Sequence, residues 1–246
     1  RIVAGIMDPS DGVVSFKGSD VARMNAGDRR AADLAVQMVF QDPMASLNPR
    51  MRVIEIVGEA PVVHGVIAAN QMEPYVAEMF RRVGLDPAAM RRYPHQFSGG
   101  QRARIGIARA LAVNPTAIVC DEATAALDVS IQAQVINLFV KLREELGLTY
   151  LFVSHDLGVV SHVSDRVAVM YLGRIVELGP AEQLFTTPNH PYTQALLAEV
   201  PRLEPKKKKF AALKGEIPSP LKPPPGCHFH PRCPHAFARC KSERPA

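Results

Sequence analysis

The fold of this chain is decided by the sequence Phe-Ser-Gly-Gly-Gln at residues 97–101, followed by Ile-Val-Cys-Asp-Glu at residues 118–122. Residues 102–113 are predicted to form a helix, because apolar side chains recur at helical spacing and the first breaker is Asn114-Pro115. A serine and two glycines ahead of a helix leave backbone N–H groups free to face an anion, and the helix dipole favours negative charge there. Residues 97–101 therefore predict a site for an anion such as phosphate.

A short apolar run, residues 116–120, precedes two adjacent carboxylates, Asp121 and Glu122. This pattern predicts a buried parallel strand that delivers its acids to the carboxyl edge of a sheet. Adjacent acids repel each other, which favours a bound cation at this edge over simple solvation of a loop. Together with the phosphate site, the two acids indicate Mg-nucleotide chemistry.

Helix and strand patterns alternate along the rest of the chain. The expected elements are a helix end and turn before residue 13, strands at 13–16, 36–40 and 149–153, helices at 75–83 and 128–147, and a hairpin over 166–178. Such alternation predicts an α/β fold with a doubly wound, mainly parallel sheet.

Five motifs in this sequence resemble those of ATP-binding cassette (ABC) ATPases, and they occur in the family's order. Residues 97–101 resemble the signature motif, with Phe97 in place of the usual Leu, and residues 118–122 resemble Walker B with its catalytic glutamate. Ala126-Leu127-Asp128 resembles the D-loop, Gln41 the Q-loop glutamine and His155 the switch histidine. Residues 123–125, Ala-Thr-Ala, depart from the usual sequence after the glutamate, without loss of a catalytic group.

The resemblance implies a role for each polar residue at the site. Glu122 is expected to act as the general base that polarises the attacking water, and Asp121 to hold Mg²⁺ through water. Gln41 is expected to reach the metal or the attacking water, and His155 to contact the γ-phosphate of ATP. The alternatives are solvation of a loop for the two acids and an ordinary surface position for the histidine.

The resemblance also implies a second ATPase subunit, in a head-to-tail homodimer or heterodimer. The signature residues are expected to bind the γ-phosphate of ATP held by the opposite protomer, and the D-loop aspartate is expected to lie at the same nucleotide. These residues are Ser98, Gly99, Gly100, Gln101 and Asp128.

One motif of the family is absent from the printed sequence. No Gly-Lys dipeptide occurs, so there is no GxxxxGK[ST] loop to hold the phosphates. Residues 1–5 resemble the end of the helix that follows this loop. We therefore expect a chain cut at its amino end, inactive as an ATPase by itself; the alternatives are an unusual complete ATPase and a non-catalytic scaffold.

Several stretches resemble the ATP-binding subunits of oligopeptide and dipeptide importers. They are residues 40–51, 126–134, 190–193 and 226–234. The resemblance implies an ABC ATPase domain over residues 1–200, with a helical subdomain at about 45–110, and a C-terminal extension over 201–246. It implies energised import of di- or oligopeptides, although nickel and glutathione importers use similar subunits.

The composition describes an ordinary soluble globular protein, with 47% hydrophobic and 22% charged residues and a net charge of +5. No apolar stretch approaches the roughly 18 residues of a membrane span. The resemblance therefore implies a peripheral subunit at the cytoplasmic face of the inner (plasma) membrane, beneath separate permease subunits and indirectly served by a solute-binding protein. The lysine run at 206–209 is expected to be a solvated linker rather than a contact for lipid or nucleic acid.

A different class of function is a soluble ABC ATPase that acts on nucleic acid or ribosomes. Such a protein needs a long coiled-coil insertion or a second cassette, and this sequence has neither. We therefore expect no nucleic-acid partner.

Four cysteines are too few for a disulfide framework at this length. Cys120 is expected to be a small core side chain. Cys227, Cys233 and Cys240 lie close together in the sequence among histidines, and the resemblance implies an iron–sulfur cluster in some relatives. Iron–sulfur or zinc ligation and simple packing of reduced thiols both remain open for these three.

Overall fold

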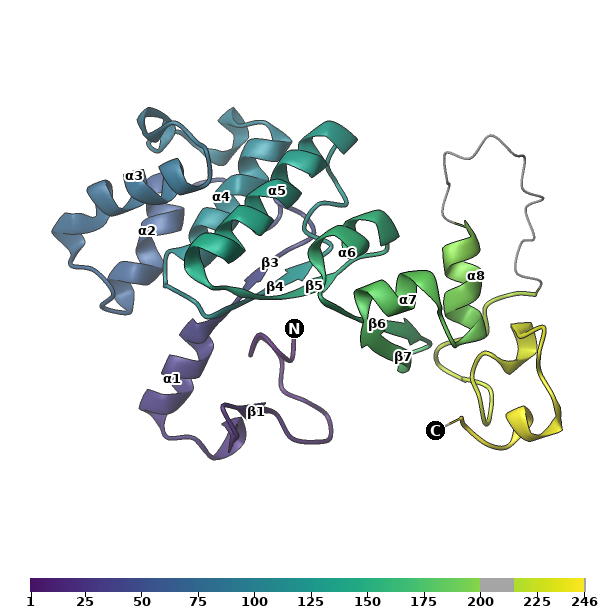
Figure 1. Cartoon of the computed structure of the whole chain (residues 1–246). Helices are drawn as coiled ribbons and strands as arrows, with labels where there is room; N and C mark the ends of the chain where they lie inside the picture. The colour runs from purple at the N-terminus through teal and green to yellow at the C-terminus, as the bar shows by residue number, and fades with distance from the viewer. Residues whose placement is uncertain (200–214, 246) are drawn as a thin grey trace. The chain divides into compact units, whose positions relative to one another are not determined.

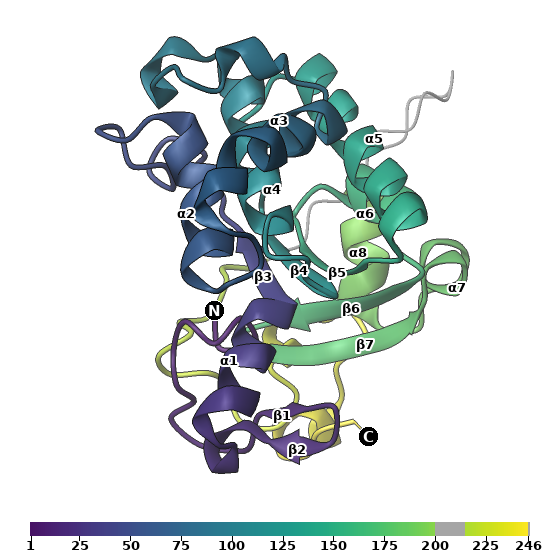
Figure 2. The same ribbon diagram turned by 90° about the vertical axis from the view of Figure 1, so that its left-hand side faces the viewer.

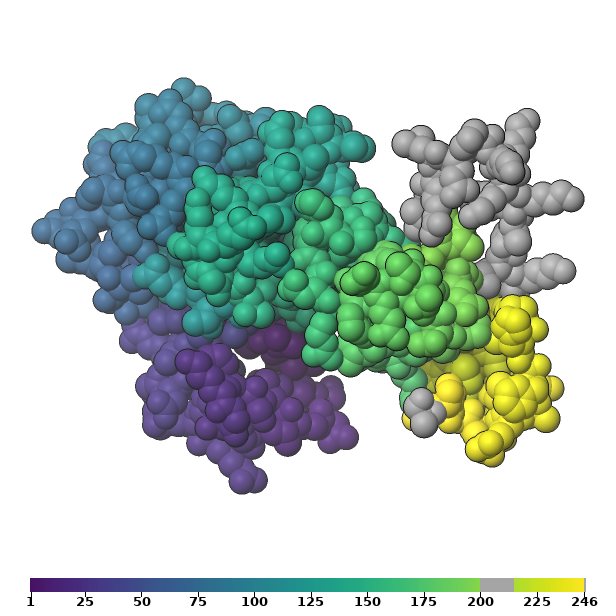
Figure 3. Space-filling model, in the orientation of Figure 1, coloured from purple at the N-terminus to yellow at the C-terminus, as the bar shows by residue number. Residues whose placement is uncertain are grey.

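The computed structural model describes residues 1–199 and 215–245, which are coloured in the ribbon of Figure 1 and in the space-filling view of Figure 3. The chain divides into two compact units, residues 1–155 and residues 156–246. The predicted domain boundary near residue 200 and the lysine run at 206–209 lie outside the described residues.

The first residues of the first unit form a turn and a small hairpin. Gly5 N–H donates to the Ile2 carbonyl (3.0 Å) and Ile6 N–H to the Arg1 carbonyl (3.1 Å), with Gly5 at a φ of +68°. This is the hydrogen-bond pattern of a helix C-terminal cap, and it agrees with the helix end predicted for these residues. The hairpin of β1 (Ser15–Phe16) and β2 (Ser19–Asp20) follows, and it is shorter than the predicted strand at 13–16.

A parallel sheet forms the centre of the first unit, in the order β3-β4-β5. Its strands are β3 (Val36–Val39), β4 (Ala117–Asp121) and β5 (Thr149–Val153), close to the predicted ranges. Their carboxyl ends lie at one edge, since Val39 pairs with Cys120 and Asp121 with Val153. Cys120 is fully buried, as predicted, and burial raises the pKa of its thiol.

Helices cover one face of this sheet, where α4 (Gly99–Leu111) and α5 (Val129–Leu146) lie against it (Figure 1). Phe139 of α5 is almost fully buried and makes edge-to-face contacts with Tyr150 and Phe152 of β5, at 5.4 and 5.6 Å between ring centroids. Such aromatic pairs add to the free energy gained from burial alone. They fix β5, and with it the loop that carries His155.

The opposite face of β5 is open in the described part of the chain. Leu151 and Val153 are 48% and 46% exposed, in a strand that its apolar sequence predicts to be buried. Helices of the first unit thus cover one face of β5. A doubly wound sheet, by contrast, carries helices on both faces.

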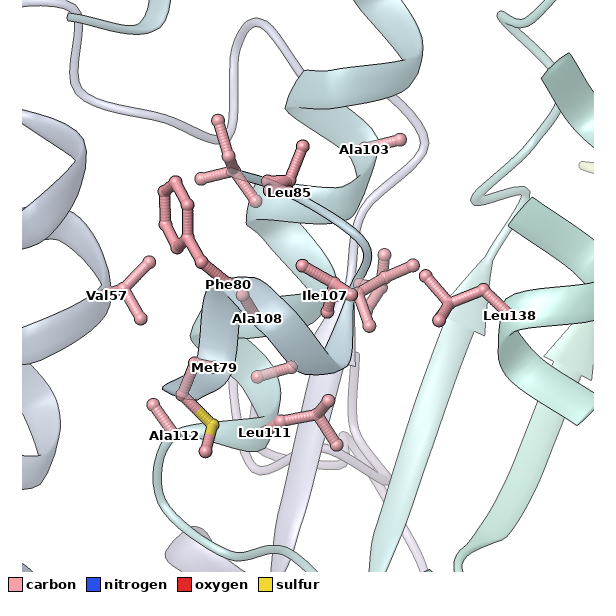
Figure 4. Close-up of a cluster of buried hydrophobic side chains, with 14 of the residues drawn as sticks. Val57, Met79, Phe80, Leu85, Ala103, Ile107, Ala108, Leu111, Ala112 and Leu138 are labelled. Atoms are coloured by element: carbon pink, nitrogen blue, oxygen red, sulfur yellow. The ribbon is translucent and has the colours of Figure 1, made fainter. Parts of the chain in front are cut away.

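The helical subdomain packs beside the sheet. α2 (Val53–Val63) and α3 (Met72–Arg82) pack with α4 around a continuous apolar cluster that includes Val57, Phe80 and Ile107 (Figure 4). Val76, Met79 and Phe80 of α3 are buried, as the amphipathic pattern predicts. α2 was not predicted from the sequence, and it contains Pro61, a residue that usually disfavours a helix interior. The remaining helix of this unit is α1 (Ala26–Ala35).

The second unit is built on an antiparallel hairpin, β6 (Arg166–Tyr171) and β7 (Arg174–Pro180), seen side by side in Figure 2. Leu172 and Gly173 both have positive φ, as a tight hairpin turn requires, and the hairpin is confirmed. The helices of this unit are α6 (Leu157–Val163), α7 (Ala181–Thr186) and α8 (Pro191–Glu199). Residues 215–245 form loops with short 3-10 turns at His230–Arg232 and Ala238–Lys241.

Phe229 joins the loops to the rest of the second unit. It is 1% exposed, and its ring lies 5.3 Å from that of Tyr171, 5.4 Å from Tyr192 and 5.8 Å from His190. Residues from the hairpin, from the start of α8 and from the C-terminal loops therefore share one aromatic cluster.

Candidate functional site

Glu122 lies at the centre of a polar cluster at the carboxyl edge of the sheet. Its Oε2 accepts a hydrogen bond from Gln41 Nε2 at 2.6 Å, and its Oε1 lies 3.0 Å from His155 Nδ1. Gln41 follows β3, Glu122 follows β4 and His155 follows β5. The parallel sheet thus brings together three of the side chains that the sequence predicted for one site.

The backbone at Glu122 is held in an unfavourable conformation. Its φ is +47°, in the left-handed region that a residue with a long side chain rarely adopts. The Glu122 N–H donates to the Val153 carbonyl of β5 at 2.9 Å, and the Ala125 N–H donates to the Glu122 carbonyl at 3.0 Å. Strain of this kind costs about 1–3 kcal/mol and tends to occur at functional sites.

Gln41 and His155 reach Glu122 from the solvent side. The His155 side chain is 73% exposed, whereas that of Glu122 is 28% exposed. Gln41 is also exposed. Asp121 is the last residue of β4 and is half-buried, one residue before the carboxylate at the centre of the cluster. An acid at this edge, with an amide oxygen nearby, is the oxygen donor set that Mg²⁺ prefers.

The signature residues open α4, and they are organised by a capping box. Ser98 Oγ accepts from the Gln101 N–H (3.3 Å), while Gln101 Oε1 accepts from the Ser98 N–H (3.0 Å). A Cβ built on Gly100 would lie 2.4 Å from Cγ2 of Ile131 in α5, so a side chain there would force Ile131 to move. Gly99 lies beside Leu127 of the predicted D-loop. Signature and D-loop are therefore neighbours in one protomer.

The other predicted residues have simpler environments. Asp128 is exposed and precedes α5, and its backbone carbonyl accepts from the Gln132 N–H at 2.7 Å. Ser98 and Gly99 are exposed as well, so the start of α4 is open to a ligand.

The C-terminal cysteines line a cavity of about 1200 Å³ in the second unit, together with His228 and His235. Cys227 N–H donates to the Cys240 carbonyl at 3.0 Å, which holds two of the three cysteines close together. Burial raises the pKa of the Cys233 thiol. As arranged in residues 1–199 and 215–245, however, no group of three His, Cys, Asp or Glu side chains is placed to hold a metal ion.

Two family models match this chain, one in each of its two compact units. The sequence model of the ABC transporter family matches residues 1–125, and that of the oligopeptide/dipeptide transporter C-terminal region matches residues 176–240. The whole chain is 51% identical to the oligopeptide transport ATP-binding protein AppF of Bacillus subtilis and covers 76% of it. It is 49% identical to OppF of Salmonella typhimurium, the oligopeptide transport ATP-binding protein, and covers 75% of that protein.

The chain belongs to the ABC transporter ATP-binding family. A solved structure of cbiO1 from Clostridium perfringens, part of the ABC transporter complex cbiONQ, superposes with a TM-score of 0.65 at 26% identity, covering 76% of this chain and 72% of the other. The ATP-binding cassette MJ0796, in a dimeric post-hydrolysis state bound to ADP and Pi, gives a TM-score of 0.63 at 27% identity, covering 73% and 78%. The predicted family and fold class are confirmed.

Two features of this ABC ATPase were not predicted from its sequence. The left-handed backbone at Glu122 has no signal in residue type, because glutamate is not a residue that favours positive φ. The capping box could have been predicted, since a serine followed three residues later by a glutamine is its usual signature.

Proposed function

We propose that this chain supplies the energy of ATP hydrolysis to a membrane importer of di- or oligopeptides. The observation that carries the proposal is the convergence of Gln41, Glu122 and His155 at the ends of β3, β4 and β5. An ABC ATPase must place a base, a phosphate contact and a metal contact around one γ-phosphate, and Glu122, His155 and Gln41 have side chains suited to these three roles.

In this mechanism Glu122 polarises the water that attacks the γ-phosphate. Gln41 and His155 flank the two carboxylate oxygens, so each can orient the base or turn to the phosphate and metal. Asp121 and Gln41 would hold Mg²⁺, which when bound neutralises charge on the phosphates. Ser98 and the N–H groups at the start of α4 would contact the nucleotide of a second protomer.

The proposed partners follow from this arrangement. The nucleotide would be sandwiched between two ATPase subunits, beneath transmembrane permeases that receive peptide from a solute-binding protein.

Among the described residues no helix is long and apolar enough to cross a membrane. From the membrane transport named for its relatives we propose a peripheral position at the cytoplasmic face of the inner membrane. We also propose a division into an ATPase domain and a C-terminal extension near residue 200. Names of relatives such as the di/tripeptide transport protein DppF of Pseudomonas aeruginosa (47% identical, covering 76% of that protein) favour peptide over nickel or glutathione.

The test of hydrolysis is Glu122→Gln, compared with Glu144→Gln on the exposed side of α5 as a control. The protein used carries a Walker A segment ahead of residue 1, because the present sequence has no GxxxxGK[ST] motif. Glu122→Gln should keep ATP binding and lower hydrolysis by about 10²-fold or more, the scale of a lost general base. Near-normal turnover in this variant would remove Glu122 from its role.

For the C-terminal cysteines we propose that iron or zinc binds only if Cys227, Cys233 and Cys240 move together, since they form no ready metal site as arranged. Metal analysis of anaerobically purified protein decides between ligation and packing. Ligation predicts near one site per chain, lost in Cys233→Ser. Metal-free protein with unchanged transport would leave the thiols with a packing role only.

A further inference from the structure

Arginines on α4 use their guanidinium groups to bind backbone carbonyls of other elements. Arg102 Nε donates to the Pro94 carbonyl at 2.8 Å and Arg104 Nη1 to the Val83 carbonyl at 2.7 Å. Arg109 Nη1 donates to the Ser46 carbonyl. A charged donor makes a stronger hydrogen bond than a neutral one, so each of these contacts fixes a segment of backbone to the helix that begins with the signature motif.

Arg109 differs from the others in the segment that it holds. Its Cζ lies 6.0 Å from the centroid of the Phe40 ring, within the range of a cation–π contact. Phe40 immediately precedes Gln41, and Ser46 lies at the far end of the same loop. One half-buried guanidinium therefore contacts both ends of the loop that presents the Gln41 amide to Glu122.

The loop between these two ends is compact, so holding its ends also fixes its middle. Asp42 Oδ1 accepts from the Met44 N–H at 2.7 Å, and the Ser46 N–H donates to the Asp42 carbonyl at 3.1 Å. Leu47, next to Ser46, is 1% exposed in the apolar core. A movement at Ser46 is therefore transmitted to Gln41 by a short, hydrogen-bonded turn.

We infer that Arg109 is a positioning residue for ATP hydrolysis, which joins the signature helix to the Gln41 loop and acts on the reaction through Gln41. The inference rests on the proposed roles of Gln41 and Glu122. Burial lowers the pKa of Arg109, yet guanidinium remains charged in proteins, so the contact is not expected to switch with pH.

The experiment is a double-mutant cycle of Arg109→Met with Gln41→Ala, in protein that carries a Walker A segment. Arg109→Met should lower kcat by up to about 10²-fold, the cost of a misplaced group, while KM for Mg-ATP changes little. In the Gln41→Ala background the same substitution should lower kcat by less than about 2-fold, because the two residues act as one unit. Arg109→Lys should restore part of the rate, since it can still donate to Ser46.

Arg104→Met is the matched control, because Arg104 lies on the same helix and binds the Val83 carbonyl instead. Its effect on kcat should be the same with and without Gln41→Ala. Equal effects of Arg109→Met in both backgrounds would overturn the inference while leaving the proposed function intact. No effect of Gln41→Ala alone would instead remove the role of Gln41, and the inference with it. If Arg109→Met does not fold, Arg109→Lys and Phe40→Leu can each be combined with Gln41→Ala in the same double-mutant cycle.

Discussion

The strand-end site of the first unit and the cysteine cavity of the second unit contrast in how their residues are placed. Gln41, Glu122 and His155 are far apart in sequence, yet hydrogen-bond distances of 2.6 and 3.0 Å join them. Cys227, Cys233 and Cys240 lie within fourteen positions of one another in the sequence, yet they form no ready metal site in the described residues.

The difference comes from the elements that carry these residues. Parallel strands in fixed register deliver their carboxyl ends to one edge, so a residue just past each strand has little freedom in its position. The cysteines lie on loops with only short 3-10 turns, where the backbone does not impose one arrangement. Closeness in sequence is therefore a weaker guide to a site than a shared sheet edge.

The largest effect is expected in the first unit, where replacing the signature serine should abolish ATP hydrolysis. Ser98→Arg should abolish ATP hydrolysis while leaving nucleotide binding to isolated monomers intact, because Ser98 acts on the partner's nucleotide. It also removes the helix cap, at a cost of about 1 kcal/mol in stability. Ser161→Arg, on exposed α6 of the second unit, is the control and should keep full activity. Equal loss of monomer binding in Ser98→Arg would contradict a sandwiched nucleotide.

A smaller effect is expected on stability when the buried aromatic side chain of each unit is removed. Phe139→Ala and Phe229→Ala each remove a side chain that is 1% exposed, and each should cost about 3–5 kcal/mol. Hydrogen exchange should show lost protection around β4 and β5 in the first variant and around β6, β7 and α8 in the second. ATP hydrolysis should fall in Phe139→Ala and survive in Phe229→Ala. Loss of protection in both units from either substitution would show that they do not fold separately.

The smallest effect is acid destabilisation of the second unit. Burial lowers the pKa of His190. Burial acts to raise the pKa of Glu177, but the Thr193 hydroxyl and the N–H groups of Asn189 and His190, which donate at 2.7 and 3.1 Å, together outweigh it and leave that pKa lowered. The unfolded chain then binds protons more readily than the folded one.

Stability should therefore fall as pH drops below 6.5, the ordinary pKa of histidine, and again below 4.5, that of glutamate. Thermal unfolding of the second unit, measured between pH 8 and about pH 4, should show this loss. The loss should be smaller in Glu177→Gln and in His190→Gln. A midpoint that stays constant across this range, or rises on acidification, would contradict the assignment.

The fold and the members of the site were largely predictable from the sequence, and the reasons are local. Apolar periodicity predicted α3 and α5, and the polar residues that follow three apolar runs predicted the sheet edge with its acids. α2 escaped prediction because Pro61 contradicts a helical pattern. The open face of β5 escaped prediction because one-sided and two-sided burial cannot be told apart in a strand of four apolar or aromatic residues and one threonine.

The geometry inside the site was less predictable than its membership. Nothing in the residue type at Glu122 indicates a φ of +47°, since the neighbouring strand and turn impose it. The contact of Arg109 with both ends of the Gln41 loop joins residues far apart in sequence, and no local pattern encodes it. Tertiary packing alone places these groups.

In the proposed mechanism Gln41, Glu122 and His155 surround one γ-phosphate. The most direct test is a crystal structure of the protein, with a Walker A segment ahead of residue 1, trapped with Mg-ADP and aluminium fluoride as a mimic of the transferring phosphate. We expect Glu122 within about 3.2 Å of the water bound to aluminium, and Gln41 and His155 within hydrogen-bond distance of Mg²⁺, this water or a fluoride. If the aluminium fluoride complex is bound while Glu122 and His155 point away from it, these residues do not act on the γ-phosphate.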